Sequence, residues 1–76
     1  MDNRKYSVVI VDDCPLFRKG AADTLTASNH FQVLGLTGDE KTALSLIGLK
    51  PDVVVIDLDA REFQPLNLLK AIKYRQ

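Results

Sequence analysis

Two runs of β-branched residues constrain the fold of this chain more than any other feature. Val8–Val11 is followed directly by Asp12 and Asp13, and Val53–Ile56 is followed directly by Asp57. Continuous apolar runs of this length are typical of strands that are buried on both faces, as in parallel sheets. We therefore predict a parallel sheet, with Tyr6–Val11 as one strand and Val53–Ile56, the most hydrophobic run, in a central place.

The segments between and after these runs have helical periodicity. Pro15 suits the first turn of a helix that runs to about Ala27, and small or apolar residues recur on one of its faces: Phe17, Gly20, Ala21, Thr24 and Leu25. A second helix opens at Gly38 and Asp39 and stops before Gly48 and Pro51, with a buried stripe of Ala43, Leu44 and Ile47. A third helix starts at Pro65 or Leu66, with apolar positions at Leu66, Leu69 and Ile72.

A further strand, Phe31–Leu36, alternates weakly between apolar and polar residues and is expected near an edge of the sheet. The element order is then β-α-β-α-β-α with short links, which favours right-handed crossovers and an α/β fold with strand order 2-1-3. Sites in such sheets form beyond the carboxyl ends of the strands, where the strand order reverses. That point lies between the first and third strands.

Three aspartates are therefore expected in one crevice, because Asp12 and Asp13 end the first strand and Asp57 ends the third. Neighbouring strands lie about 4.8 Å apart, so the like charges repel and attract a cation. Carboxylate oxygens suit Mg²⁺ or Mn²⁺. The competing interpretation is purely structural, with Asp12 or Asp13 capping a helix and Asp57 ending a strand.

Composition narrows the classes of function. The chain has 76 residues, enough for one small domain, and its net charge of zero argues against direct binding to nucleic acid or an anionic membrane. A single cysteine, Cys14, allows no internal disulfide, which favours a reduced, cytoplasmic protein. We expect Cys14 to be a small, half-buried residue near a helix start, and His30 to be a solvated turn residue.

The two aspartate motifs, at this separation, resemble the receiver domain of bacterial two-component response regulators. The resemblance rests on Val-Val-Ile-Val-Asp-Asp-Cys-Pro-Leu-Phe-Arg-Lys-Gly at 8–20 and Pro-Asp-Val-Val-Val-Ile-Asp-Leu-Asp at 51–59. The first motif is most similar to receivers that precede a LuxR-type DNA-binding domain. The resemblance implies a flavodoxin-like receiver fold, with residues 1–76 as its N-terminal part, a truncated (βα)3 unit ending after the third helix.

The resemblance also implies roles for individual residues. Asp57 would be the phosphoacceptor that takes a phosphoryl group from a histidine kinase, and Mg²⁺ would be held by Asp12, Asp13, Asp57 and the backbone carbonyl of Asp59. The chain would be a signalling domain and not an enzyme. DNA would be contacted only through an effector domain that this chain does not contain, and no membrane contact is expected.

The chain also departs from the family pattern. Ala60 and Arg61 stand where receivers usually have Met-Pro, and Pro65 falls near an expected glycine. The family's switch Ser or Thr and its phosphoryl-binding lysine lie in a part that follows the third helix. A chain that stops there exposes the flank of its third strand, so we expect a homodimer or higher assembly through that strand, unless the chain is a fragment.

Three rival interpretations compete with this one. The Asp57-Leu58-Asp59 triplet is similar to the signature of haloacid-dehalogenase-type phosphatases, but the chain has no room for that family's later lysine and acidic pair. A nucleotide-binding module needs a glycine-rich first turn, where this chain has Asp12 and Asp13. The strongest rival is a truncated, non-catalytic receiver that serves as a binding or oligomerisation module.

Overall fold

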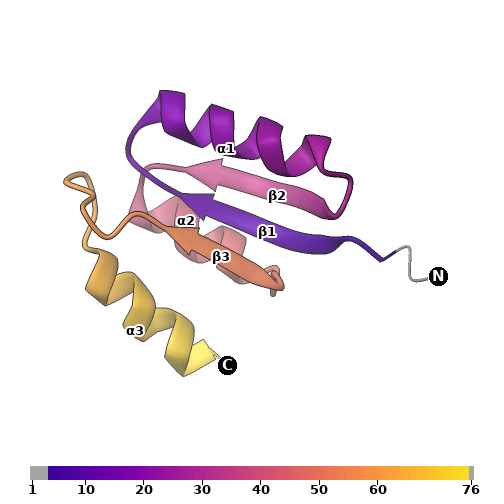
Figure 1. Cartoon of the computed structure of the whole chain (residues 1–76). Coiled ribbons are helices and arrows are strands. Elements are labelled where there is room, and N and C mark those ends of the chain that lie inside the picture. Colours follow the sequence, from indigo (N-terminus) through magenta and orange to yellow (C-terminus); the bar gives the residue numbers. More distant parts are fainter. Residues whose placement is uncertain (1–3, 76) are drawn as a thin grey trace.

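Strands and helices alternate strictly along the chain, as the sequence predicts. The computed structural model describes residues 4–75 (Figure 1). The elements are β1 (Tyr6–Val11), α1 (Pro15–Ala27), β2 (Phe31–Thr37), α2 (Glu40–Ile47), β3 (Val53–Ile56) and α3 (Pro65–Arg75). Within this part of the chain, no helix is both long and apolar enough to cross a membrane.

The three strands form one parallel sheet in the order β2-β1-β3, which confirms the predicted fold class. α1 covers one face of the sheet, and α2 and α3 cover the other (Figure 1). The central strand is β1, whose residues Val8–Val11 are at most 1% exposed. The prediction that Val53–Ile56 is central was wrong, because β3 pairs with β1 on one side only and is an edge strand among the described residues.

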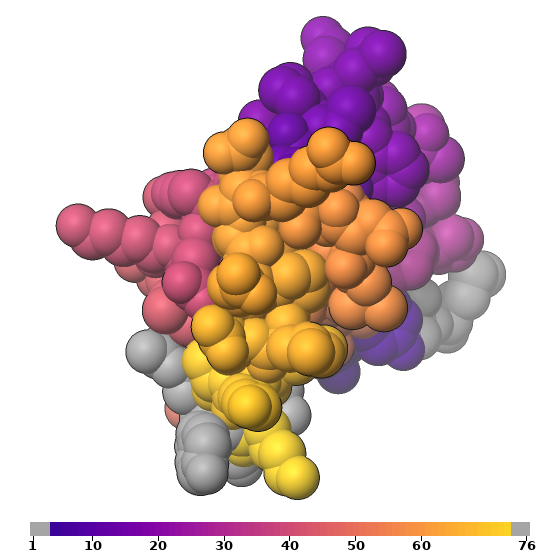
Figure 2. Space-filling view, turned by 90° about the vertical axis from the view of Figure 1, so that its left-hand side faces the viewer, coloured from indigo at the N-terminus to yellow at the C-terminus, as the bar shows by residue number. Residues whose placement is uncertain are grey.

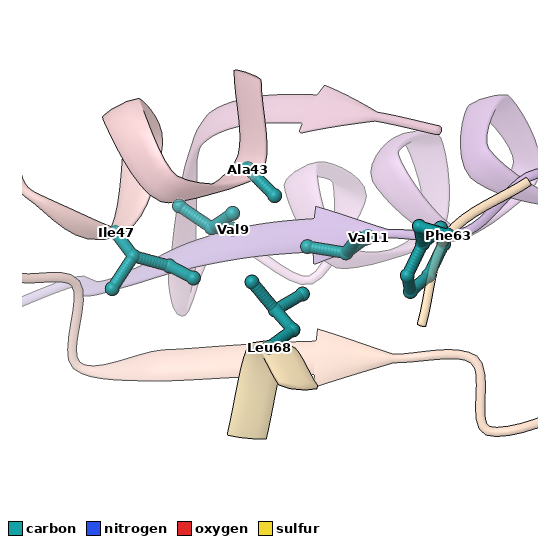
Figure 3. Close-up of a cluster of buried hydrophobic side chains, with 6 residues drawn as sticks. All are labelled: Val9, Val11, Ala43, Ile47, Phe63 and Leu68. Atoms are coloured by element: carbon teal, nitrogen blue, oxygen red, sulfur yellow. The ribbon is translucent and has the colours of Figure 1, made fainter. Parts of the chain in front are cut away.

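The main core lies between the sheet and the pair α2 and α3. It is built from six buried side chains that point toward one another (Figure 3): Val9, Val11, Ala43, Ile47, Phe63 and Leu68. On α3, Leu68 is fully buried while Leu66 and Leu69 are 69% and 41% exposed. The predicted α3 stripe was therefore wrong at two positions, because the inward stripe is Leu68 with Ile72, which packs against this cluster one turn further along.

The α1 face of the sheet is much less covered. None of the residues of α1 is fully buried, and Phe17, on the helix face expected to be apolar, is 54% exposed. On the same side of the sheet, Val53 and Val55 of β3 are each 39% exposed. The helix packs mainly over β2 and β1, so it covers this face of β3 only weakly among residues 4–75.

Asp52 joins the beginning of β3 to the beginning of β1. Its Oδ2 accepts hydrogen bonds from the Ser7 N–H (2.8 Å) and the Ser7 hydroxyl (3.1 Å), and its Oδ1 pairs with Arg4 at 3.0 Å. The Ser7 backbone N–H is the main reason that the pKa of Asp52 lies below its ordinary value of 3.8. The charged carboxylate is therefore the form that the folded chain prefers.

We expect stability to depend on this carboxylate in acid. A group whose folded-state pKa is lowered contributes stability above its unfolded value, 3.8, and loses it as the pH falls through the lower, folded-state value. The urea midpoint should thus fall as the pH drops below about 4, and it should fall less in Asp52→Asn, which has no charge to lose. Circular dichroism measures the urea midpoint at each pH. If the midpoint fell equally in the wild type and in Asp52→Asn, this role for Asp52 would be contradicted.

Candidate functional site

All three strands end at the same edge of the sheet, and the predicted aspartates meet there. Figure 2 looks onto this edge, where the loop after β3 (orange) lies between the start of α1 and α3. The Asp57 N–H donates to the Val11 carbonyl at 2.9 Å, which fixes the end of β3 beside the end of β1. One carboxylate oxygen from each of Asp12, Asp13 and Asp57 then lies within 4.8 Å of the others. The predicted convergence is confirmed.

Asp12 is held rigidly by its backbone and one side-chain oxygen. Its N–H donates to the Thr37 carbonyl at 2.9 Å, and its Oδ1 accepts the Cys14 N–H at 2.8 Å. Its carbonyl accepts a bond from Arg18 Nη1 at 2.6 Å. This packing leaves Asp12 only 7% exposed. Its carboxylate does not cap α1, whose N-cap residue is Cys14 and which has no side-chain cap bond. The capping interpretation therefore does not account for Asp12.

Asp13 reaches across to the loop that follows β3. Its Oδ2 accepts hydrogen bonds from the N–H groups of Arg61 (2.6 Å) and Glu62 (3.2 Å). The Arg61 N–H is the largest cause of the lowered pKa of Asp13, so the carboxylate stays charged. The loop that departs from the usual receiver sequence at Ala60 and Arg61 is thus fastened to the acidic cluster through backbone amides, which any residue but proline can supply.

Asp57 is oriented by the residue two positions later. Its Oδ1 accepts the Asp59 N–H at 2.9 Å, a local turn that aspartate often makes. The side chain of Asp59 is exposed and lies outside the group of three carboxylates. Across residues 4–75, each of the three carboxylates engages one of its oxygens with a backbone N–H, which leaves its second oxygen for another ligand.

This donor set suits a hard divalent cation. Three carboxylates within 4.8 Å repel one another, and oxygen ligands of this kind are those that Mg²⁺ takes in proteins. Beside the cluster lies a hollow of about 490 Å³ whose lining includes Asp57, Cys14 and Phe17. Cys14 is exposed there, which corrects the expectation that it is half-buried. His30 is exposed, as expected of a solvated turn residue.

Sequence reasoning missed two contributors to the site, Arg18 and Gly38. A Cβ added at Gly38 would lie 2.5 Å from Arg18 Nη1 and 3.2 Å from the Asp12 carbonyl oxygen. The glycine therefore leaves the space in which Arg18 supports the Asp12 backbone. The one signal of this support in the sequence was the arginine at the fourth position of the first helix. From the first turn of a helix, a long side chain can reach back to the β1–α1 turn.

Comparison with known proteins gives a consistent set of relatives. The nitrate/nitrite response regulator protein NarP of Escherichia coli is 33% identical over 69 residues, or 90% of this chain and 32% of NarP. A protein-glutamate methylesterase/protein-glutamine glutaminase of Vibrio vulnificus is 31% identical over 71 residues, or 92% of this chain and 21% of that protein. No protein-family model matches the chain.

A solved structure of a response-regulator domain is also similar to this chain. The signal receiver domain of the response regulator NarL from Mycobacterium tuberculosis superimposes with a TM-score of 0.84 at 33% identity. The match covers 95% of this chain and 59% of that one. The chain spans about a fifth to a third of the length of the curated relatives it matches.

The parallel 2-1-3 sheet and the aspartates at its carboxyl edge define an open, flavodoxin-like α/β domain. Together with these relatives, they place the chain in the response-regulator family, where it corresponds to the receiver domain of two-component signalling. A receiver of the LuxR-type subfamily fits both the sequence and the structure.

Proposed function

We propose that this chain is a Mg²⁺-dependent phosphoacceptor, with Asp57 taking a phosphoryl group from a histidine kinase. The observation that carries the proposal is the gathering of Asp12, Asp13 and Asp57 within 4.8 Å, beside an open hollow that Asp57 lines. A structural role alone gives no reason for three carboxylates to face one another, since like charges at this range repel.

Asp12, Asp13, Asp57 and the Asp59 backbone carbonyl are the groups that would hold the ion. When bound, a divalent cation lowers the repulsion between a carboxylate and the oxygens of an incoming phosphoryl group. Asp57 supplies the nucleophile: the oxygen that accepts the Asp59 N–H would also face the ion, while the other oxygen attacks phosphorus. The bond from phosphorus to the donor's nitrogen breaks as the new oxygen–phosphorus bond forms. The chain thus acts mostly by positioning and charge neutralisation.

The partners follow from the same proposal. A histidine kinase is the donor, and a transcription-regulating output domain is the element controlled. The matched segment is 32% of NarP, a length that leaves room for such a domain. The matched segment is also 21% of a protein-glutamate methylesterase, so an enzyme is the alternative attached domain. We also propose a cytoplasmic location and self-association of the chain through the exposed third strand.

Phosphoryl transfer to Asp57 can be tested without the kinase. Incubation with acetyl phosphate and Mg²⁺ should add the mass of one phosphoryl group to the wild-type chain, and none to Asp57→Asn. Asp59→Ala is the matched control, because only its backbone is assigned a role, and it should still be modified. Intact-mass spectrometry measures all three. An unmodified wild-type chain, or equal modification of Asp57→Asn, would falsify the proposal.

The alternative is a non-catalytic receiver that works as a binding or oligomerisation module. The observation that favours it is the incompletely packed face of α1, together with the flank of β3 that no strand covers among the described residues. In that case acetyl phosphate leaves the mass unchanged although the chain is folded and takes up a divalent ion. The same experiment therefore separates the two functions.

A further inference from the structure

One peptide unit joins two of the three clustered carboxylates, and Arg18 holds its carbonyl. The Asp12 carbonyl belongs to the peptide between Asp12 and Asp13, and it accepts a hydrogen bond of 2.6 Å from Arg18 Nη1. Because a peptide unit is planar, a bond to its oxygen also restrains the Cα atoms at its two ends. Arg18 therefore acts on the backbone that carries two of the three carboxylates.

Gly38, in the turn between β2 and α2, packs against the same peptide unit. A Cβ at this position would lie 3.2 Å from the Asp12 carbonyl oxygen, 3.3 Å from the Asp13 Cα and only 2.5 Å from Arg18 Nη1. Gly38 does not have a positive φ, so its backbone conformation does not demand glycine. The position needs a glycine chiefly for the space that the guanidinium occupies. That need depends on the arginine.

Arg18 is not the counter-ion of the acidic cluster. Among residues 4–75, its hydrogen bond goes to a carbonyl, and no carboxylate lies within salt-bridge distance of it. Its Nε is buried and has no hydrogen-bond partner within the described part of the chain, which costs free energy of desolvation. This cost offsets part of what the bond to the Asp12 carbonyl contributes to stability, so the arrangement is poorly suited to a purely stabilising role.

We propose that Arg18 is a positioning residue for the metal site, which holds the peptide unit between Asp12 and Asp13 so that both carboxylates serve the same cation. Gly38 belongs to this arrangement because it leaves room for the guanidinium. The inference rests on the proposed function, since the carboxylates are those of the phosphoacceptor site. Removing a group that orients metal ligands without touching the ion typically weakens metal binding about 10- to 100-fold.

The sign of the effect separates positioning from simple charge. A positive charge near the cluster repels a cation, so removing it would strengthen metal binding if charge alone mattered. Because Arg18 positions two of the ligands, Arg18→Met should instead bind Mn²⁺ about tenfold more weakly than the wild type. Arg18→Lys keeps the charge and a donor that can reach one carbonyl, so it should recover most of the affinity.

Electron paramagnetic resonance measures free Mn²⁺ directly during a titration of each chain, and circular dichroism shows that each metal-free chain is folded. Lys19→Met is the matched control, because it removes a positive charge from the next, exposed residue of the same helix. A charge exposed to solvent is screened by salt, so this control should bind Mn²⁺ within about twofold of the wild type. Arg18→Met that binds as tightly as the wild type, or more tightly, would overturn the inference. Equal weakening in Lys19→Met would overturn it as well.

Gly38→Ala tests the same arrangement without changing any charge. The new Cβ must displace the guanidinium, so the alanine should weaken Mn²⁺ binding about tenfold in the wild-type background. It should add little to Arg18→Met, where the displaced group is gone. Gly20→Ala is the control, since a Cβ at Gly20 meets nothing within 4 Å. Independent effects of the two substitutions would contradict the shared role. If Arg18→Met did not fold, the comparison of Gly38→Ala with Gly20→Ala would decide alone.

Failure of this inference can be told from failure of the proposed function, because metal binding and phosphoryl transfer are measured separately on the same chains. A wild type that binds Mn²⁺ but gains no mass with acetyl phosphate would contradict the phosphoacceptor proposal and leave the role of Arg18 standing. A wild type that is phosphorylated, with a metal affinity that Arg18→Met does not change, would overturn the inference alone. A wild type that does not bind Mn²⁺ would overturn both.

Discussion

Replacing Leu68 with alanine should lower the melting temperature by at least about 10 °C. A fully buried leucine cut to alanine costs about 2–5 kcal/mol, because the apolar contact is lost and a cavity remains. A chain of this size has a total stability of only about 4–11 kcal/mol. Leu68 is 0% exposed and is the side chain through which α3 enters the core beneath Val9 and Val11 (Figure 3). Thermal and urea unfolding by circular dichroism measure the loss.

Leu69→Ala is the matched control for this experiment. It makes the same chemical change one residue later on the same helix, where the side chain is 41% exposed. Partly exposed leucines lose little burial when shortened, so the melting temperature should change by a few degrees at most. If Leu69→Ala cost as much as Leu68→Ala, the inward face of α3 would be the one predicted from its sequence and not the one in the structure.

The difference between these two leucines illustrates what the sequence can and cannot predict. Strands and helix starts were predictable, because Val8–Val11, Pro15 and Asp39 act locally: Asp39 caps α2 through the Thr42 N–H at 3.1 Å. The side of α3 that points into the core was not predictable, because Leu66, Leu68 and Leu69 are equally apolar. Which leucine points inward depends on how the loop after β3 directs the helix axis. That direction is set by contacts between distant parts of the chain, such as those of Phe63 with the core.

The prediction that β3 lies in the centre of the sheet failed for a related reason. The apolar run Val53–Ile56 has the composition of a strand with neighbours on both sides, and composition alone predicts a central place. Among the described residues it pairs only with β1, so Val53 and Val55 remain partly exposed. A strand whose sequence suits the centre of a sheet but which lies at the edge has an unsatisfied preference for a neighbour. This mismatch is the physical basis of the proposed self-association through β3.

At the site, the convergence of the three aspartates was predictable from the sequence, and the groups that orient their side chains were not. Asp12, Asp13 and Asp57 could be placed together because parallel strands end at one edge, which is a property of topology. The groups that orient them are mostly backbone N–H donors, from Cys14, Arg61 and Asp59. Every residue but proline has such a donor, so no residue type marks it in a sequence. Only the fold reveals which amides face the carboxylates.

Saturating Mg²⁺ or Mn²⁺ should raise the melting temperature substantially. A ligand that binds only the folded state stabilises it by about 1.4 kcal/mol at ten times its Kd and about 2.7 kcal/mol at a hundred times. For a chain of this size, that corresponds to roughly 6–20 °C. The effect is expected because three carboxylates within 4.8 Å repel one another until a cation lies between them. Differential scanning fluorimetry across a metal titration measures it.

The variants of the cluster make the metal test specific. Asp57→Asn removes one of the repelling charges but keeps an oxygen that can accept the Asp59 N–H, so without metal it should melt slightly above the wild type. With metal, most of the gain should be lost in Asp57→Asn and Asp12→Asn. Asp59→Ala should keep the full gain, since only its carbonyl is assigned to the ion. If the Asp12 and Asp57 variants responded to the metal as strongly as the wild type, the cation would bind elsewhere, and phosphoryl transfer at Asp57 would lose its electrostatic basis.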